Sequence, residues 1–328
     1  METTFAEPDL AIHAPHPPID HRREALLALL RGLDRDGYRF VTATPATHAR
    51  VIGRPGREEA RSLRDVLGWS LPFGPDVVPS EILELLREGE ALRQRPDGLL
   101  QATLRVSSVR DTLFLHSAYP TTAHDAVFLG PDSYRFADFI VAQMGSLAPG
   151  ARIVDYGAGA GVGGITAARG QPRSQLTLAD INPKALFLSS INAEFAGLSH
   201  TAITASTPDE LDGPFDLFVT HPPFMMDGDG RAYRDGGDLY GARLSLEWVL
   251  AGVRLLAPGG KLILHTGVSI VDGRDVLLEQ LTAQLGDAGL AIDYHELDPD
   301  IFSEDLDQPA YAQVERIAAV GLVIARPT

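Results

Sequence analysis

The sequence predicts an α/β protein in which helices cover both faces of a mostly parallel sheet, with a smaller helical domain in front of it. From residue 150 onward, strand-like apolar segments alternate with segments of helical periodicity, which is typical of parallel strands joined by crossover helices. Before residue 120, three helical segments are followed by two strand-like segments, a winged-helix-like pattern. Hydrophobic residues make up 45% of the 328 residues, so the chain can bury a large core.

The N-terminal part divides into a tail and the helical domain. Residues 1–19 are acidic and Pro-rich, and we expect a flexible tail there. Ser80 is a candidate N-cap for the third helix of the domain. Within this domain, 20–120, we expect helices at 23–37, 57–69 and 79–93, then strands at 98–109 and 111–119.

The remainder of the chain, 121–328, is expected to form the sheet domain. Its last two strands have no helical segment between them, so they should pair antiparallel at one edge of the sheet. We expect strands at 152–156, 174–180, 200–205, 215–220, 260–266, 290–297 and 314–326, and helices at 163–169, 183–196, 241–256 and 273–288.

Composition and charge exclude several kinds of protein. The chain has no cysteine, which excludes disulfides and thiolate catalysis, and its histidines have no metal-ligand spacing, so we expect no metal. The net charge is −16; residues 20–130 carry 15 basic and 15 acidic residues, whereas 131–328 carry 13 and 26. This acidic half opposes non-specific binding to nucleic acid, which depends on cationic contacts to phosphates. We recognise neither a signal peptide nor an apolar run of about 20 residues, and therefore expect a cytoplasmic protein without a membrane partner.

The segment RIVDYGAGAGVGGI, 152–165, joins an apolar strand to a helix through a glycine-rich loop. Its glycines allow a tight turn and let a ligand approach the free N–H groups of the helix, and they also match the dinucleotide pattern G-x-G-x-x-G. Asp155, before the loop, would repel a phosphate and attract an ammonium group. Asp180, at the end of the next strand, can accept hydrogen bonds from both ribose hydroxyls. Adenosine with an amino-acid ammonium describes S-adenosylmethionine, whereas NAD would use only the second acid.

These motifs, followed by a strand that ends in His221-Pro222-Pro223-Phe224, resemble a class I S-adenosylmethionine-dependent methyltransferase. More narrowly, they resemble the small-methyltransferase group of release-factor glutamine N-methyltransferases and guanine-N2 rRNA methyltransferases. The resemblance covers about 125–328 and implies a Rossmann-like seven-stranded methyltransferase sheet with an antiparallel last strand. It implies that S-adenosylmethionine, or its product S-adenosylhomocysteine, is held by Asp155, Gly157, Ala158, Gly159, Gly161, Asp180, Ile181, Asn182, Ser206, Thr207 and His221.

The resemblance also implies that the corner formed by His221, Pro222, Pro223 and Phe224 is catalytic. The prolines fix the turn, and the family's usual Asn or Asp at the first position holds the two hydrogens of a planar NH₂ on which the aromatic residue stacks. His221 departs from that pattern. A neutral imidazole has one acceptor nitrogen and can take a proton near neutral pH. An amine, a guanidine-type nitrogen or a hydroxyl is therefore a better substrate group here than the family alone implies.

Two further segments hold weaker candidates for substrate contacts. The segment VFLGPDSYRF, 127–136, stands where the family has a cofactor-flanking segment; the alternative is a helix start packed on the sheet. The segment after the corner is long, polar and glycine-rich, which is typical of a lid; the alternative is a solvated connection. The candidates are Tyr134 and Arg135 in the first segment and Tyr233, Arg234 and Tyr240 in the second.

The sequence therefore favours methyl transfer to a polar nitrogen of a small-molecule or amino-acid-type substrate by a monomer or homodimer. The N-terminal domain would serve closure over the substrate or dimerisation. The alternatives are an rRNA or tRNA base methyltransferase, supported by the Arg-rich run at 48–64, a protein glutamine N-methyltransferase, and a small-molecule O-methyltransferase. A nucleotide-binding dehydrogenase would leave the corner at 221–224 unexplained, and a non-catalytic winged-helix regulator would keep the fold without activity.

Overall fold

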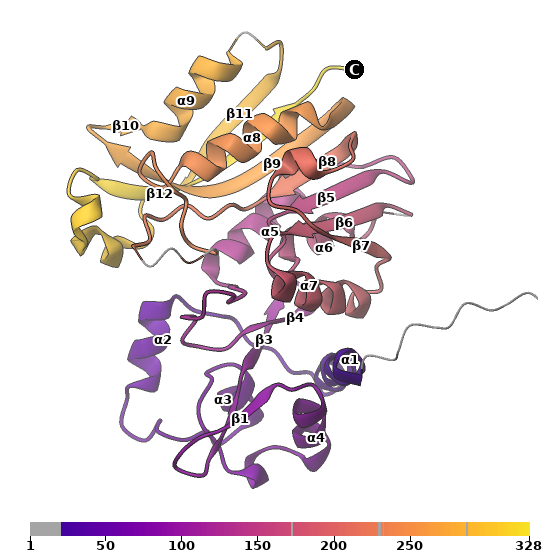
Figure 1. Ribbon diagram of the computed structural model, residues 1–328, viewed down its shortest axis with the longest axis vertical. Coiled ribbons are helices and arrows are strands. Elements are labelled where there is room, and N and C mark those ends of the chain that lie inside the picture. Colours follow the sequence, from indigo (N-terminus) through magenta and orange to yellow (C-terminus); the bar gives the residue numbers. More distant parts are fainter. Residues whose placement is uncertain (1–20, 172, 229–230, 232, 287) are drawn as a thin grey trace, which may run out of the picture.

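The structure is a computed structural model that describes residues 21–171, 173–228, 231, 233–286 and 288–328. The tail expected at 1–19 lies outside the described residues. Two parts lie one above the other along the longest axis of the molecule: the N-terminal helices with their short strands, and the large sheet with its helices (Figure 1).

The large sheet has seven strands in one continuous order. The strands are β5 (Arg152–Tyr156), β6 (Gln175–Asp180), β7 (His200–Thr204), β8 (Phe215–Thr220), β9 (Leu256–Val271), β11 (Ala291–Asp298) and β12 (Arg316–Ala325), and a short β10 (Arg274–Asp275) pairs with β9. Their order is β11-β12-β9-β8-β5-β6-β7. The pairs among β7, β6, β5, β8 and β9 are parallel, whereas β12 is antiparallel to both β9 and β11. The predicted methyltransferase sheet is thus confirmed, with β12 inserted between β9 and the edge strand β11.

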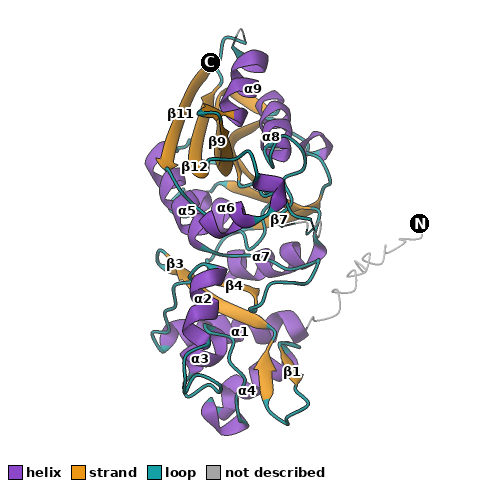
Figure 2. Cartoon of the chain, turned by 90° about the vertical axis from the view of Figure 1, so that its left-hand side faces the viewer, coloured by secondary structure: helices purple, strands orange, loops and turns teal. Residues whose placement is uncertain are grey.

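Helices cover both faces of this sheet, as predicted (Figure 2). The helices α5 (Pro131–Gln143), α6 (Val162–Ala168) and α7 (Pro183–Phe195) pack into one hydrophobic core, and α8 (Arg243–Arg254) and α9 (Val276–Leu285) pack into a second one. The helix α5 corresponds to the helix start that was the alternative for 127–136; it begins at Pro131, a position where the missing N–H costs no helical hydrogen bond. Phe139 of α5 packs over Gly321, where an added Cβ would lie 2.5 Å from the ring. Short 3-10 turns lie at Pro208–Glu210, Ser303–Asp307 and Pro309–Tyr311.

The N-terminal part contains short helices and two separate two-stranded sheets. The elements are α1 (His21–Arg35), α2 (Pro45–Ile52), α3 (Leu63–Leu67), a 3-10 turn at Pro75–Val77, α4 (Ser80–Glu88), β1 (Leu92–Gln94), β2 (Leu100–Ala102), β3 (Leu104–Val109) and β4 (Thr112–Ser117). β1 pairs with β2, and β3 pairs with β4. The winged-helix arrangement stays a prediction.

Several expected bounds in this part were wrong. The helix expected at 57–69 is much shorter and consists only of α3. The helix α2 was not expected. Its N-cap residue Thr44 accepts a hydrogen bond from the Thr47 N–H. The helix expected at 79–93 is α4, which ends at Glu88. The Gly89 N–H after it donates to the Leu85 carbonyl and closes the last turn. The residue at its N-cap is Pro79 rather than Ser80. The strand expected at 98–109 is divided between β2 and β3, which belong to different sheets.

The two parts of the molecule share a hydrophobic core. The core that contains α5, α6 and α7 continues into α1, α4, β3 and β4 of the N-terminal part. Asn192 of α7 is fully buried at this junction, where its side-chain oxygen accepts the Leu115 N–H at 2.8 Å. Its amide nitrogen donates to the carbonyls of Leu115 at 3.0 Å and Ala160 at 2.9 Å. A division into domains at residue 120 stays a prediction, since the core crosses that boundary.

Candidate active site

A cavity of about 570 Å³ lies at the carboxyl ends of β5, β6 and β8. This is the edge of an open parallel sheet where ligands bind, because the loops that follow neighbouring strands diverge there. The walls come from the glycine loop, the corner at 221–224, the first turn of α5 and the side of α8. Pro45, the residues 119–122 and the segment around Tyr233 also reach the cavity.

The glycine loop forms one wall of the cavity through Gly157, Ala158 and Gly159. Gly157 has φ +72° and faces Trp248 of α8 so closely that an added Cβ would lie 2.6 Å from the indole ring. Both the left-handed backbone and the missing side chain are therefore required there. Gly161, with φ +82°, caps α6 and packs against Ser189 behind the loop, outside the cavity lining.

Asp155 lies at the base of the loop as a buried carboxyl that lines the cavity. Its Oδ2 accepts the Gly164 N–H at 2.7 Å. Burial raises the pKa of the Asp155 carboxyl to about 7, although the Gly164 hydrogen bond opposes this rise. A cationic group in the cavity would restore the charged form, so the environment of Asp155 fits an ammonium ligand.

Asp180 ties the glycine loop to the end of β6. Its Oδ2 accepts the Gly159 N–H and its Oδ1 accepts the Asn182 N–H, both at 2.8 Å. Burial raises the pKa of the Asp180 carboxyl, while these hydrogen bonds lower it. Next to it, Ile181 leaves 58% of its surface exposed at the cavity. A large apolar side chain open to a cavity fits a flat ring such as adenine.

Two more residues of the expected cofactor set lie beside this end of the cavity. Asn182 lines it and caps α7, since its side chain accepts the Lys184 N–H at 3.0 Å. Ser206 also lines the cavity, and its hydroxyl donates to Glu210. Thr207 is outside the lining, one residue further along the chain.

His221 stands at the corner after β8, with its ring on the cavity. Its Nδ1 lies 2.7 Å from the carbonyl oxygen of His265. A carbonyl can only accept, so Nδ1 carries the hydrogen and Nε2 is the acceptor nitrogen of the neutral ring. Burial lowers the pKa of His221, and the nearby Asp132 carboxylate partly opposes this. The geometry therefore favours a neutral imidazole whose second nitrogen is available to a ligand.

The remaining corner residues, Pro222, Pro223 and Phe224, line the cavity beside His221. The rings of His221 and Phe224 lie 5.8 Å apart. Gly267 of β9 leaves room for the Phe224 ring, because an added Cβ would lie 2.3 Å from it. This glycine supports the corner from a strand whose sequence carried no motif.

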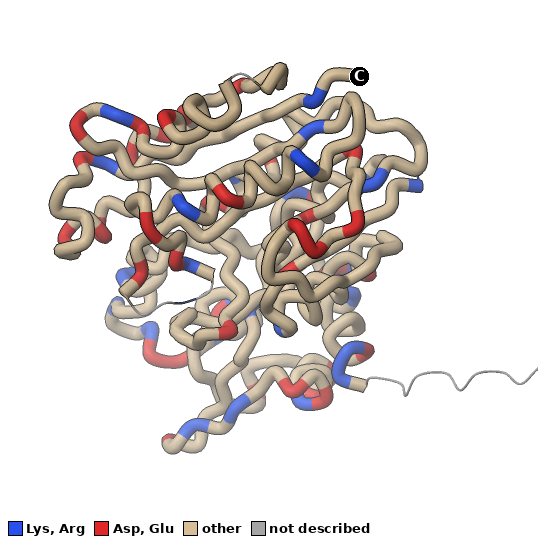
Figure 3. Tube along the Cα trace, turned by 45° about the horizontal axis from the view of Figure 1, so that its top comes forward, with Lys and Arg blue, Asp and Glu red and all other residues tan. Residues whose placement is uncertain are grey.

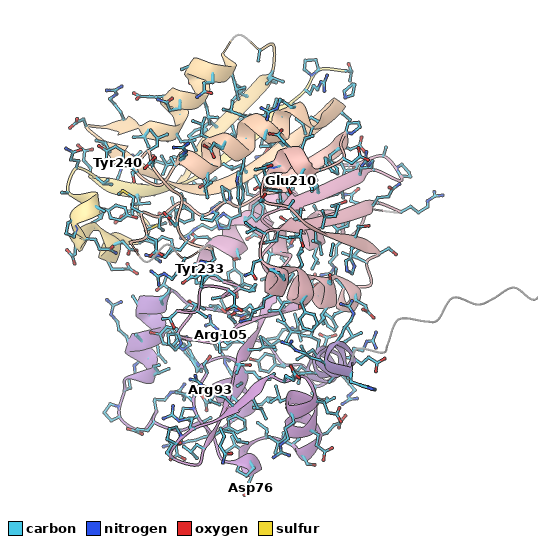
Figure 4. All side chains as sticks on the ribbon, viewed as in Figure 1. Asp76, Arg93, Arg105, Glu210, Tyr233 and Tyr240 are labelled. Carbon is cyan, nitrogen blue, oxygen red and sulfur yellow. The ribbon has the colours of Figure 1, made fainter. Side chains whose placement is uncertain are left out.

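The segment after the corner folds back over the cavity. The Tyr233 hydroxyl donates to the carbonyl of Thr121 at 2.6 Å, and its ring stacks on Phe128 at 5.7 Å. Arg234 lines the cavity and forms an ion pair with Asp305 at 2.6 Å. Tyr240 lies outside the lining, where its hydroxyl donates to Gln313. Figure 4 accordingly has Tyr233 at the junction of the two parts and Tyr240 higher, beside the sheet.

The segment 127–136 meets the cavity through different residues from those expected. Tyr134 faces the N-terminal part and accepts the Thr42 N–H at 2.9 Å, and Arg135 pairs with Asp132 and Asp298. Neither lines the cavity. Phe128, Asp132, Ser133 and Phe136 line it instead. Positions 132, 133 and 136 share one face of a helix, so recognising α5 in the sequence would have identified them.

The described residues contain no group of three or more His, Asp or Glu side chains that could hold a metal ion. Among the same residues, none of the helices combines the length and the apolar character that a membrane crossing requires.

The sheet order, with a glycine loop held between two carboxylates at its carboxyl edge, is the arrangement that the resemblance to S-adenosylmethionine-dependent methyltransferases implied. Residues 124–266 match the family model of the methyltransferase small domain. The resemblance inferred from the sequence is thereby confirmed.

Curated relatives of the chain carry two kinds of name. The release factor glutamine methyltransferase of Chlorobaculum tepidum is 29% identical over 163 residues, 44% of this chain and 54% of that protein. The one of Deinococcus radiodurans is 30% identical over 145 residues, 42% and 51% of the two chains. Ribosomal RNA small subunit methyltransferase C of Pseudomonas entomophila is 37% identical over 104 residues, 28% and 31% of the two chains. The chain thus spans about half the length of the first relatives it matches.

Among solved structures, Trm5b from Pyrococcus abyssi aligns with a TM-score of 0.48 at 13% identity, over 77% of this chain and 68% of that chain.

Proposed function

We propose that the protein is an S-adenosylmethionine-dependent methyltransferase that acts on a polar nitrogen of a small-molecule or amino-acid-type substrate. The observation that carries the proposal is the His221 ring, which offers an acceptor nitrogen to the same cavity that Asp155 and Asp180 flank. A methyl group transferred in line needs an acceptor atom held beside the cofactor, and these residues lie on one continuous surface.

Different residues of the chain would bind different parts of the cofactor. Asp155 would hold the amino-acid ammonium, and Asp180 would accept from the ribose hydroxyls, for which it would exchange or share its present N–H partners. Ile181 would cover the adenine. When bound, S-adenosylmethionine supplies an electrophilic methyl group on a positively charged sulfur, which takes up the electron pair of the broken C–S bond.

At the acceptor end, His221 would hold the substrate nitrogen by accepting one of its hydrogens at Nε2. The nitrogen's lone pair forms the new N–C bond, and the proton that the nitrogen releases passes to Nε2 or to solvent. The backbone carbonyl of His265 holds Nδ1–H and so keeps the ring in the accepting tautomer. Phe224 would cover the reacting group and exclude water.

Enclosure and charge favour a small group over a folded nucleic acid. The linker at 119–128 and the segment around Tyr233 are joined above the cavity by the 2.6 Å hydrogen bond to Thr121. Basic positions along the described chain are scattered among acidic ones (Figure 3), and the net charge of −16 opposes phosphate binding.

The second candidate is methylation of a polymer, because the relatives are named for release factor glutamine and for ribosomal RNA. A glutamine side chain is itself an amino-acid-type nitrogen and could enter the cavity alone. An RNA base, or a small-molecule hydroxyl for O-methylation, would use the same His221 acceptor.

The test uses the full chain with S-adenosylmethionine labelled in its methyl group. Label is measured in three acceptor pools: small amines and guanidines, glutamine-bearing peptides, and ribosomal and transfer RNA. We expect transfer to the first pool and its loss in a His221→Ala variant, whereas transfer to the glutamine-bearing peptides alone would select the polymer candidate in its protein form. Transfer to RNA alone, with micromolar RNA affinity at physiological salt, would select the polymer candidate. Calorimetric binding of NAD but not of S-adenosylhomocysteine would overturn the whole assignment.

A further inference from the structure

Asp132 is a buried carboxylate on the cavity wall and has no part in the proposed chemistry so far described for Asp155, Asp180 and His221. It lies in the first turn of α5 with 2% of its surface exposed, and it lines the same cavity as His221. Phe136, one helical turn later on the same face, has its ring 5.5 Å from the His221 ring. The first turn of α5 and the corner therefore face one another across the reacting end of the cavity.

The hydrogen bonds of Asp132 leave one oxygen for a ligand. Arg135 donates to Oδ1 at 3.1 Å, whereas no hydrogen bond to Oδ2 is found within the described part of the chain. Arg135 also donates to Asp298 at 2.7 Å, so its charge is shared between two carboxylates. A buried carboxylate with one free oxygen is costly unless a donor completes it. A ligand in the cavity could supply that hydrogen-bond donor, because Asp132 lines the cavity.

His221 by itself leaves a substrate nitrogen incompletely held. A neutral imidazole accepts one hydrogen, whereas an amine or guanidine nitrogen brings two or more. A second acceptor on the facing wall would complete the arrangement, and a carboxylate there would also stabilise positive charge.

We propose that Asp132 and His221 form an acceptor pair for the hydrogens of the methyl-accepting nitrogen, and that this pair selects an amine or guanidine. The inference rests on the proposed function and adds to it a catalytic residue and a substrate class. Asp132 supplies the negative acceptor at Oδ2, His221 supplies the neutral acceptor at Nε2, and Arg135 holds the carboxylate in place through Oδ1.

Two probes of the cofactor site test this proposal without knowledge of the substrate. Sinefungin carries an amine on the carbon that replaces the methyl-bearing sulfur, so its ammonium group enters the acceptor end of the cavity. S-adenosylhomocysteine has the same adenosine and amino-acid parts without that amine. Titration calorimetry of the full chain should give at least tenfold tighter binding of sinefungin than of S-adenosylhomocysteine.

The decisive variant is Asp132→Asn, which keeps the size of the side chain. We expect it to reduce the preference for sinefungin to within threefold while S-adenosylhomocysteine affinity changes by less than threefold, which also shows that the variant is folded. Asp298→Asn is the matched control. It removes the other carboxylate partner of Arg135 outside the cavity lining, and it should keep the wild-type preference.

Three outcomes would overturn the proposal. The first is equal affinity of the wild type for the two probes. The second is an unchanged sinefungin preference in Asp132→Asn. The third is an equal loss of both affinities in that variant, which would assign Asp132 to the amino-acid part of the cofactor. If neither probe binds the wild type, the proposed function itself fails, and that result differs from all three.

Discussion

The two faces of the central sheet are built from similar helices but are covered differently. On one face, α5, α6 and α7 pack on the sheet and the N-terminal part packs on them in turn, so that one hydrophobic core runs through both. On the other face, α8 and α9 close a second core whose members all belong to the sheet domain. The N-terminal part therefore adds a third layer to one face only.

This difference matters because the cofactor loop lies on the covered face. Asn192 joins the carbonyl of Ala160, inside the glycine loop, to the backbone of Leu115 in the N-terminal hairpin. On the opposite face, Ser245 and Thr266 form a comparable buried hydrogen bond at 2.8 Å that involves neither the loop nor the N-terminal part. The N-terminal layer thus supports the glycine loop and also forms part of the cavity wall.

The largest effect should come from His221, which lines the cavity at the carboxyl end of β8. His221→Ala should lower kcat by about 10²-fold or more, the usual scale for acid–base assistance, and leave S-adenosylhomocysteine affinity nearly unchanged. His221→Asn restores an amide acceptor and should retain more activity than the Ala variant. Steady-state kinetics on the acceptor that the labelling experiment identifies checks both variants.

The pH profile separates the roles that His221 can have. It must be neutral to accept, so kcat should fall as the pH drops through its pKa, which burial lowers below the usual value of about 6.5. The acid limb should disappear in His221→Asn. A His221→Ala variant with wild-type kcat would show that His221 ends the strand but takes no part in catalysis.

The next effect tests the comparison between the faces directly. Asn192→Ala leaves three buried backbone groups without their partner, which should lower the free energy of unfolding by at least about 2 kcal/mol. It should also weaken S-adenosylhomocysteine binding severalfold, because Ala160 lies in the loop. Urea denaturation and titration calorimetry measure the two quantities.

Ser245→Ala is the matched change on the other face. It should cost about 1 kcal/mol of stability and leave cofactor affinity unchanged. If both variants reduced cofactor affinity equally, the cause would be general destabilisation. That result would refute the proposal that the N-terminal layer supports the glycine loop.

A smaller effect is expected at the end of β6. Asp180→Ala should weaken cofactor binding at least tenfold, about 1.4 kcal/mol, because hydrogen bonds to the ribose and to the Gly159 N–H are removed together. Calorimetric titration with S-adenosylhomocysteine measures this change, and an affinity equal to that of the wild type would refute the ribose assignment.

The smallest effect is a pH dependence that originates at Asp155. The pKa of its carboxyl is about 7 in the free protein, and an ammonium ligand needs the ionised form. S-adenosylhomocysteine affinity should therefore fall by less than tenfold between pH 7 and pH 6, as the ionised fraction of the carboxyl falls. Asp155→Asn should bind more weakly and with a flat profile. A wild-type affinity that rises toward pH 6 would contradict the assignment.

Local spacing in the sequence was sufficient for the existence of the strands of the large sheet, the glycine loop and the positions of the two carboxylates. Asp155, Gly157 and Asp180 stand at strand ends or in a tight turn, where a few neighbouring residues decide the backbone. The alternation of elements likewise predicted the parallel sheet and the antiparallel end. The N-terminal part after α1 was predicted less well, because α2, α3 and α4 are short and propensity over five to nine residues is overridden by packing.

By itself the sequence determined the class of fold, from the alternation of strands and helices, and the glycine loop and the corner at 221–224, because these depend on residues close together in the chain. Only the tertiary structure decided which residues complete the cavity. Whether Asp132 or Tyr134 faces it depends on how α5 is rotated when it packs between the sheet and the N-terminal layer. Tyr119 and Phe128 reach the same space from the linker at 119–128, and Trp248 reaches it from α8. Their meeting is set by the burial of apolar surface summed over the whole molecule, which no short stretch of sequence records.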